Sequence, residues 1–386
     1  MRARTVIIAL CLVLLFAGAA QANDSLNVRR VGQDTTVALA WDVVVGDTLA
    51  YVTDYSSGRL CVISVSDPAN PKNVGHYDTL ISPEGVALSG DYVFAASNAK
   101  GLRVISVSNP ANPEEVGGCD TLLSAYDVAC SGGYAYVAAA ESGLRVVSIA
   151  DPAHPVEVGH CAIPSYSTGV SVGGQYAFVA AYDSGLRVIS IVDPSHPQEA
   201  GVFTTPGHTK DVVVSGSHAY LATDTGLRVV SISDPTHPVE VGHCTIEFAT
   251  GVTIDSGFAY VAASSGSLRV VSIADPANPT EVGHYTMSGG AFATAVSRGY
   301  MCVAYSFSGF QVFQRFVSGV EECPQPSTMG IRPATTIIRT LPAGTLVFDA
   351  MGRRVVNPRT GVFFVSEGQQ PSSHKLQAIR KVILQR

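Results

Sequence analysis

Short apolar stretches separated by turn sequences fill the chain from residue 28 to residue 316. In one representative stretch, residues 126–130, 134–139, 144–149 and 156–161 are rich in Val, Ile, Tyr and Ala, which favour strands. Between the last two, residues 151–155 must turn, because their prolines cannot donate ladder hydrogen bonds. No helical period is present. The pattern therefore predicts a unit of four short β-strands.

This four-strand unit repeats along the chain. The sequence Gly-Leu-Arg-Val-Val-Ser-Ile-Ala-Asp-Pro at 143–152 recurs with small changes, and a degraded seventh copy occupies 309–313. Successive copies are 42, 42, 42, 41 and 41 residues apart, measured between their leading leucines: Leu60, Leu102, Leu144, Leu186, Leu227 and Leu268. Four strands in one such period is the size of a β-propeller blade. Seven copies therefore predict seven blades.

The two ends of the repeat array predict that the blades form a closed ring. The seventh copy offers strands at 293–297, 300–304 and 310–313 but no clear fourth strand. Residues 28–35, ahead of the first copy, align with 73–79, which is the fourth strand of a normal unit. The extra strand at 28–35 can therefore serve as the missing fourth strand of the seventh copy. This closes the ring and leaves no exposed sheet edge. We therefore expect an all-β, seven-bladed β-propeller over 23–318, closed by an N-terminal strand; a linear β-solenoid with capping segments is the alternative.

The N-terminus has the pattern of an export signal. Arg2 and Arg4 precede an apolar stretch at 6–20, and Ala20-Gln21-Ala22 offers a small-x-small cleavage site. We expect a signal peptide at 1–22, cleaved near Ala22, and a mature protein that is secreted or attached to the outer surface. An uncleaved membrane anchor is the alternative. No later stretch is long and apolar enough for a transmembrane helix.

Composition narrows the class of protein. The net charge is −7 and only 14% of the 386 residues are charged, without a Lys/Arg run, so nucleic-acid binding is not expected. The 37 glycines and 21 prolines suit a turn-rich β protein. Of eight cysteines, Cys11 lies in the predicted signal peptide. The mature protein would therefore have an odd number of cysteines, which does not suit a framework of disulfide pairs. Most of the others fall in or beside predicted strands, so we interpret them as small packed side chains.

The repeat stops after Phe316 and a second region follows. Residues 319–330 have the composition of a linker, and 331–386 contain strand candidates at 345–348, 353–356, 361–366 and 381–384. We expect a small β-sandwich-like domain there.

Both regions resemble known families. The repeat, written here Leu-Arg-Val-Val-Ser-Ile at 144–149 and followed by Asp151-Pro152, resembles the bacterial LVIVD repeat over roughly 28–316. That resemblance implies a propeller and no common activity. The tail resembles the C-terminal sorting domain used with type IX secretion, through 348–349 with 352–355, 361–365 and 380–384. It implies passage across the outer membrane through secretion machinery; a small β-domain used only for packing is the alternative.

Candidate ligand-binding residues lie on the propeller face around the channel. In a standard blade, loops from the fourth strand to the next first strand share that face with loops from the second to the third strand, and rigid scaffolds usually place variable loops where ligands bind. The candidates are Asp42, Asp54, Glu84, Tyr126, Asp127, Tyr182, Asp183, Lys210, Asp211 and Asp224.

Three of these acids occupy one repeat position in alternate blades. Asp42, Asp127 and Asp211 start the first strands of blades one, three and five, and the seventh blade has Ala295 at the position we align with them. Their oxygens would suit a hard cation such as calcium. Alternatively they accept hydrogen bonds from backbone amides at strand ends and need no ligand. Beyond this possible calcium, we expect no cofactor and no metal site.

The repeated basic and turn residues are expected to be structural. Repeat arginines on the third strand should reach a carboxylate or backbone carbonyls, and the Asp residues before proline should cap turns. Turn histidines such as His154 exchange with asparagines such as Asn70, which fits a turn role. His208 lies outside the repeated sets and beside the channel entrance.

No linear catalytic motif is present: nucleophile elbow, phosphate loop, zinc helix and paired-cysteine patterns are all missing from the sequence. We therefore expect a monomeric, non-enzymatic scaffold whose propeller face binds a protein, a glycan or a surface polymer. The alternative is a hydrolase or lactonase-like propeller that uses channel carboxylates and a bound cation.

Overall fold

The structure, a computed structural model, describes residues 25–122 and 124–316 in full and the backbone of four strands beyond them. The predicted signal peptide and linker lie outside the described residues. The chain divides into two compact units, residues 1–315 and 316–386, which are treated separately below.

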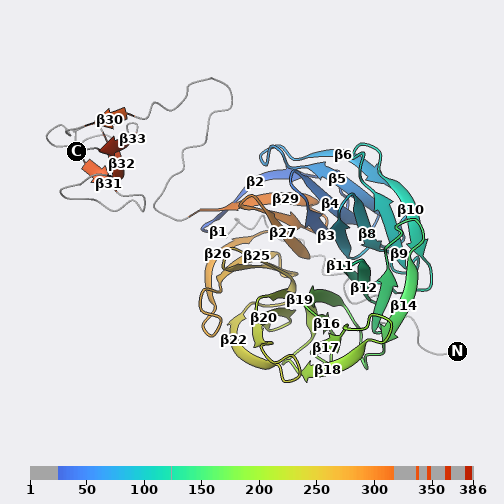
Figure 1. Ribbon diagram of the computed structural model, residues 1–386. Coiled ribbons are helices and arrows are strands. Elements are labelled where there is room, and N and C mark those ends of the chain that lie inside the picture. Colours follow the sequence, from blue (N-terminus) through green and yellow to red (C-terminus); the bar gives the residue numbers. More distant parts are fainter. Residues whose placement is uncertain are drawn as a thin grey trace. The chain divides into compact units, whose positions relative to one another are not determined.

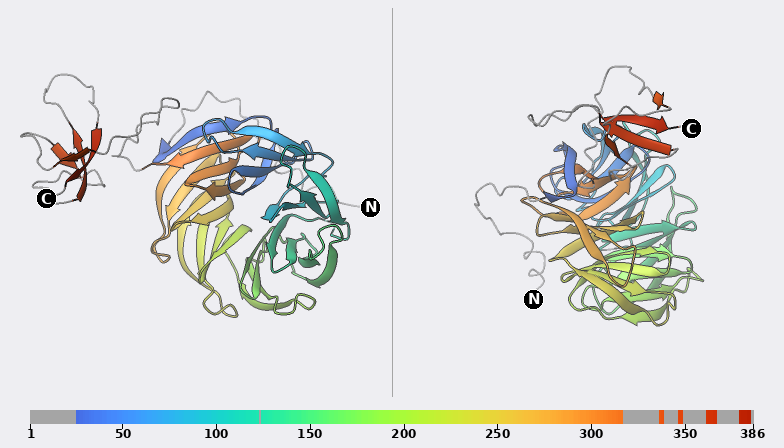
Figure 2. Two further views of the ribbon diagram at one scale, coloured as in Figure 1. Left: turned by 45° about the horizontal axis from the view of Figure 1, so that its top comes forward. Right: turned by 90° about the vertical axis from the view of Figure 1, so that its left-hand side faces the viewer.

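Seven antiparallel sheets surround a central channel, each sheet being one blade, as predicted (Figure 1). The first strand of each blade lies nearest the channel and the fourth lies on the outer rim (Figure 2). Blades 1 to 3 contain β3 (Ala40–Val45), β4 (Leu49–Asp54), β5 (Arg59–Ser64) and β6 (Lys72–Tyr77); β7 (Val86–Ser89), β8 (Tyr92–Ala96), β9 (Leu102–Ser106) and β10 (Glu114–Cys119); and β11 (Asp127–Ser131), β12 (Tyr134–Ala138), β13 (Leu144–Ser148) and β14 (Val156–Cys161). Blades 4 to 6 contain β15 (Gly169–Gly173), β16 (Tyr176–Ala180), β17 (Leu186–Ser190) and β18 (Gln198–Phe203); β19 (Thr209–Ser215), β20 (His218–Thr223), β21 (Gly226–Ser231) and β22 (Val239–Thr245); and β23 (Ala249–Asp255), β24 (Phe258–Ala263), β25 (Ser267–Ser272) and β26 (Thr280–Thr286).

The N-terminal strand closes the ring, as the repeat count predicted. Blade 7 takes β27 (Ala293–Ser297), β28 (Tyr300–Ala304) and β29 (Phe310–Arg315) from the end of the array, and its fourth strand is β2 (Val28–Asp34). β2 runs antiparallel to β29, with Val28 opposite Arg315 and Asp34 opposite Phe310. The short β1 (Ser25–Leu26) adds to the outer edge of β26. A linear solenoid is thereby excluded.

The apolar core lies between neighbouring blades. Among the described residues there are seven buried clusters, one at each junction, including the junction of blades 7 and 1 where Val52 and Phe310 are both fully buried. The second strand of every blade is almost entirely buried because it packs against a blade on either side. The repeating Leu at the head of the third strand is likewise fully buried, which explains why it is kept in six copies.

A glycine in the fourth strand lets each blade approach the next. A Cβ on Gly75 would overlap the carbonyl oxygen of Pro110, in the third-to-fourth turn of the following blade. The same overlap would occur at Gly117, Gly159, Gly201 and Gly242. Gly32 in β2 has this relation to Pro68 of blade 1, so the seam is packed like an ordinary junction.

The repeated polar residues have the structural roles predicted for them. The five repeat arginines of blades 2 to 6 pair with the glutamate twelve residues later, as in Arg145 Nη1 to Glu157 Oε1 at 2.8 Å. Asp151 Oδ1 accepts the Ala153 amide at 3.0 Å, and its other oxygen contacts His154 Nδ1 at 2.9 Å. In blade 1, Asn70 Nδ2 makes the equivalent contact with Asp67.

The cysteines in the described part of the chain are free thiols, with Cys61, Cys119 and Cys302 buried. Burial raises the pKa of Cys61 and of Cys302 to about 12, so these thiols pack as small apolar groups. Within the same residues, no helix is long and apolar enough to cross a membrane.

The C-terminal unit contains one described four-stranded sheet. Its strands are β30 (Thr336–Ile338), β31 (Leu346–Phe348), β32 (Gly361–Ser366) and β33 (Ile379–Leu384), in the order β30-β33-β32-β31. β30, which was not predicted, pairs in parallel with β33. The last three strands coincide with predicted ones, whereas predicted strand 353–356 lies outside the described residues. A second sheet, which a sandwich requires, is not part of what is described.

Candidate functional site

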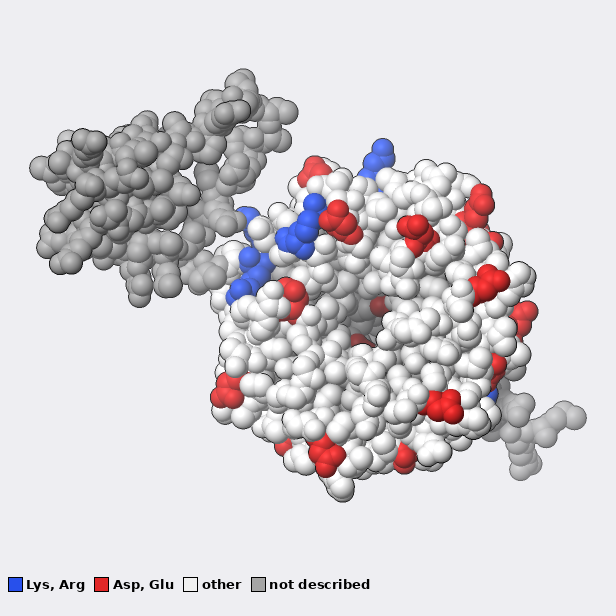
Figure 3. Space-filling model, in the orientation of Figure 1, with Lys and Arg blue, Asp and Glu red and all other residues white. Residues whose placement is uncertain are grey.

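The candidate site is the channel mouth, by which we mean the second-to-third turns together with the residues that lead into each first strand. Isolated backbone bridges join these two kinds of segment at four blade junctions. Backbone bridges join Asn98 to Ala125, Ala140 to Ser167, Tyr182 to Thr209, and Ser306 to Ala40. Figure 3 shows the central opening, with acidic atoms visible inside it.

The three channel aspartates each tie two blades together. One carboxylate oxygen accepts the amide of the next residue at 2.7 Å, and the other accepts an amide in the first strand of the following blade at 2.8 Å. The cross-blade contacts are Val86 to Asp42, Val170 to Asp127, and Val252 to Asp211. The three aspartates therefore make the backbone-amide hydrogen bonds that the second interpretation predicts.

Glycines alternate with the aspartates because the channel wall is crowded. A Cβ on Gly85 would overlap the Cα and the carboxylate of Asp127, and Gly169 lies in the same way against Asp211. The seventh blade has Ala293 at this position, since Ala293 pairs with Ala304 as Asp127 pairs with Ala138. The alignment that placed Ala295 there was wrong by two residues, because the degraded seventh copy has no Asp or Gly to fix its register.

The channel aspartates share an environment that disfavours negative charge. Burial raises the pKa of Asp42 to about 7, with a further increase from Asp211, although the amides of Val43 and Val86 oppose the shift. The pKa of Asp127 is raised well above its usual value by burial and then by the charges of Asp42 and Asp211. Burial also raises the pKa of Asp211. A negative charge on Asp211 therefore disfavours ionisation of both Asp42 and Asp127.

The described residues contain no cluster of three or more His, Cys, Asp or Glu side chains that is arranged to hold a metal ion. In the channel, both oxygens of each aspartate already accept an amide.

Glu84 and Tyr126 form one side of the mouth. Glu84 is 7% exposed, and its Oε1 accepts a hydrogen bond from Asn98 Nδ2 at 3.2 Å. Burial raises the pKa of Glu84 to about 8. Burial and then the nearby Glu84 raise the pKa of Tyr126 to about 12. These two predicted residues are thus brought together.

An aromatic stack covers the seam where the ring closes. The Trp41 ring lies 4.8 Å from Tyr55 and 4.4 Å from Phe292, centroid to centroid, with interplanar angles of 28° and 25°. Phe292 comes from blade 7 and the other two from blade 1. The sequence analysis left Phe292 out because the seventh copy was misaligned.

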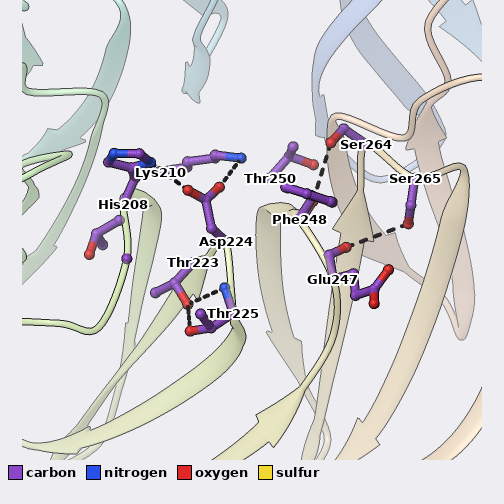
Figure 4. Close-up of polar contacts among 12 residues, drawn as sticks. His208, Lys210, Thr223, Asp224, Thr225, Glu247, Phe248, Thr250, Ser264 and Ser265 are labelled. Atoms are coloured by element: carbon purple, nitrogen blue, oxygen red, sulfur yellow. Dashed lines mark hydrogen bonds and ion pairs between the residues drawn. The ribbon is translucent and has the colours of Figure 1, made fainter. Parts of the chain in front are cut away.

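The remaining predicted mouth residues form a charged network with His208 at its centre, of which Figure 4 shows the contacts among His208, Lys210 and Asp224. His208 Nδ1 lies 2.5 Å from Asp224 Oδ2, and its Nε2 lies 3.1 Å from Asp183 Oδ1. Lys210 Nζ contacts the other Asp224 oxygen at 2.6 Å. The His208 ring also stacks on Tyr182, with centroids 4.1 Å apart. Burial raises the pKa of Asp224, but the contacts with Lys210 and His208 outweigh it and the net shift is downward.

Two repeats are one residue shorter than the others at the mouth, at different places. In blade 5 the missing residue lies in the second-to-third turn, where Asp224-Thr225 replace the three-residue sequence 182–184. In blade 6 it lies in the loop that leads into the first strand, and in that loop Phe248 is 53% exposed. Sequence inspection missed Phe248, although the shortened period was a signal for it.

Asp54 was wrongly assigned to the mouth. It is 1% exposed, and its carboxylate accepts hydrogen bonds from the amides of Ala38, Leu39, Ser56 and Ser57. Asp54 precedes the mouth position by one residue, and successive strand residues point to opposite faces. Tyr55 is the residue of blade 1 that occupies the mouth position.

Comparison with known proteins agrees with this fold. No curated protein matches the sequence. The crystal structure of the computationally designed Ika8 protein matches with a TM-score of 0.57 and 10% identity, over 74% of this chain and 99% of the designed one. At that identity the likeness concerns the fold alone. The LVIVD repeat model matches residues 39–79, 83–121, 124–163, 164–205, 206–246 and 248–287. The chain is therefore a member of the LVIVD repeat family.

Proposed function

We propose that this protein is an exported, non-enzymatic binding scaffold that recognises a protein, a glycan or a surface polymer through the channel mouth. The observation that carries the proposal is the contrast between conserved framework positions and a varied mouth within one chain. The residue before the channel Asp, Gly or Ala takes six identities in seven blades, and only threonine occurs twice: Trp41, Glu84, Tyr126, Thr168, Lys210, Thr250 and Phe292. A rigid ring that presents different side chains at equivalent places is suited to recognition.

The contacts in the channel favour binding over turnover. A hydrolase of the lactonase type would use the channel carboxylates on a bound cation, yet those carboxylates connect blades through backbone amides. His208 is also held on both ring nitrogens by carboxylates, which leaves it poorly placed to accept a proton from a substrate.

The proposal includes a location. The export signal at 1–22 and the tail at 331–386 fit a monomeric protein that is secreted or held at the outer surface through the type IX machinery. Its test is a truncation after Pro324 in the producing organism, followed by cell fractionation. We expect the truncated propeller to accumulate inside the outer membrane; equal surface display with and without the tail would contradict a sorting role.

Binding is tested with the mature protein and with fractionated envelope polysaccharides and surface proteins of the producing organism. A triple variant, Tyr126→Ser, Asp183→Ser and Phe248→Ser, should lose binding, whereas Lys72→Ser on the outer rim should retain it. Equal binding by both variants would contradict a role for the mouth. Turnover of ester, lactone or glycoside substrates that the triple variant loses would favour the hydrolase instead.

A further inference from the structure

Phe248 is an exposed aromatic ring on a fixed backbone. It has φ 55°, in the left-handed region that a bulky residue rarely adopts. Its amide donates to the Asp224 carbonyl at 3.0 Å, and its own carbonyl accepts the Ser264 amide at 3.0 Å. These contacts with two neighbouring turns hold a strained conformation that leaves the ring 53% exposed.

Polar groups beside the ring are held in place by one another. Lys210 Nζ lies 5.9 Å from the centre of the Phe248 ring and contacts Asp224 (Figure 4). The ammonium has three protons, of which the Asp224 contact uses one. Asp183 is 69% exposed on its side chain, with one oxygen on His208. The network thus offers a donor, the Lys210 ammonium, beside the aromatic ring, and an acceptor, Asp183, on the opposite nitrogen of His208 from Asp224.

The network has no excess of positive groups. Two carboxylates, Asp183 and Asp224, both contact His208, and Lys210 contacts Asp224. A site of this kind offers no net attraction to an anionic ligand, while hydroxyl groups can pair with its ammonium and its carboxylates.

We propose that the mouth between blades 5 and 6 binds an uncharged glycan. One pyranose ring of the glycan stacks on Phe248, and hydroxyls along the glycan are hydrogen-bonded to Lys210 and Asp183. The apolar face of a sugar ring packs on an aromatic face, and a few fixed polar groups set its orientation. This inference rests on the proposed binding function and names its ligand class and contact residues.

The test is calorimetric titration of the mature protein with three hexasaccharides: cellohexaose, the N-acetylglucosamine hexamer and hexagalacturonate. At least one neutral hexamer should bind, and hexagalacturonate should bind more weakly. Phe248→Leu and Lys210→Met should each weaken the neutral hexamer about tenfold or more, whereas Phe248→Tyr should stay within about threefold. Phe316→Leu, at the 37% exposed Phe316 directly after β29 and away from the mouth turns, and Lys72→Met are matched controls that should bind like the wild type.

Three outcomes would overturn the inference. Wild-type affinity in Phe248→Leu would exclude aromatic stacking, and preference for hexagalacturonate would contradict the lack of net attraction to an anionic ligand. If no neutral hexamer binds while envelope material still binds at the mouth, the glycan assignment fails and the binding function stands. If the triple mouth variant also binds envelope material like the wild type, the binding function fails as well. Melting temperatures of all variants verify that each is folded.

Discussion

The channel aspartates should make the propeller more stable in mild acid than in mild base. Burial raises the pKa of Asp42 to about 7 in the folded protein, from 3.8 in the unfolded chain. Because the folded state binds this proton more tightly, its contribution to stability is fully present below pH 3.8. It is lost as the pH rises through about 7.

The size of the effect follows from the shift. At about 1.4 kcal/mol per pKa unit, Asp42 alone costs about 4 kcal/mol once it is fully ionised. Between pH 5 and pH 8 the part that is lost is about 2–3 kcal/mol. The turn aspartates such as Asp193, whose pKa is lowered to about 2 by Ser195 and His196, stay ionised in this window and do not confound it.

The perturbation is Asp42→Asn, which keeps an acceptor for one amide and cannot ionise. Urea unfolding at pH 5, 6, 7 and 8 gives the free energy of unfolding of each protein. Asp42→Asn should be less stable than the wild type at pH 5, because one amide loses its acceptor, and the difference should shrink or reverse by pH 8. Asp91→Asn, in the exposed turn between β7 and β8, is the control and should keep the wild-type slope. Parallel pH profiles for the wild type and Asp42→Asn would refute the reasoning.

Three further perturbations test the ring and its repeat. Deleting residues 23–36 should lower the melting temperature by at least about 10 °C, since it removes the fourth strand of blade 7, whereas truncation after Pro324 should leave the propeller's melting unchanged; equal effects in calorimetry would contradict closure. Gly75→Ala should cost about 1–3 kcal/mol in urea unfolding, because its Cβ overlaps the next blade, while Gly46→Ala, which meets a movable leucine, should cost less; the reverse order would be contrary evidence. His154→Asn should change stability by less than about 0.5 kcal/mol, since asparagine makes the same turn contact elsewhere; a larger loss would assign the histidine another role.

Most of the propeller could be predicted from the sequence because its constraints are local and repeated. A leucine that must be buried, a glycine that must admit the next blade and an aspartate that must cap a turn each recur at the same place. The closure could also be predicted, since β2 carries the Val-Gly sequence found in all the other fourth strands except β18, which has Ala-Gly, and Gly32 of β2 packs on Pro68. The register of blade 7 could not be predicted, because the seventh copy lacks these repeated residues at the equivalent positions.

The mouth was harder to predict than the framework. The two kinds of loop do meet at the channel, but their side-chain contacts depend on which loops meet across blades and on the direction of single side chains. Asp54 shows the sensitivity to direction, since an error of one residue moves a carboxylate from the mouth into a buried turn. The pairing of His208 with both Asp183 and Asp224 joins segments from two blades, and no spacing in the sequence specifies it. The conformation of Phe248 depends on backbone hydrogen bonds to the turns at Asp224 and Ser264, which belong to two different blades.

A crystal structure of the mature protein soaked with the neutral hexasaccharide that binds best would test the functional account most directly. The account predicts a sugar ring packed on Phe248, with hydroxyls within hydrogen-bond distance of Lys210 Nζ and of the Asp183 carboxylate. A sugar bound only on the outer rim, or a mouth that stays empty at saturating concentration, would contradict it.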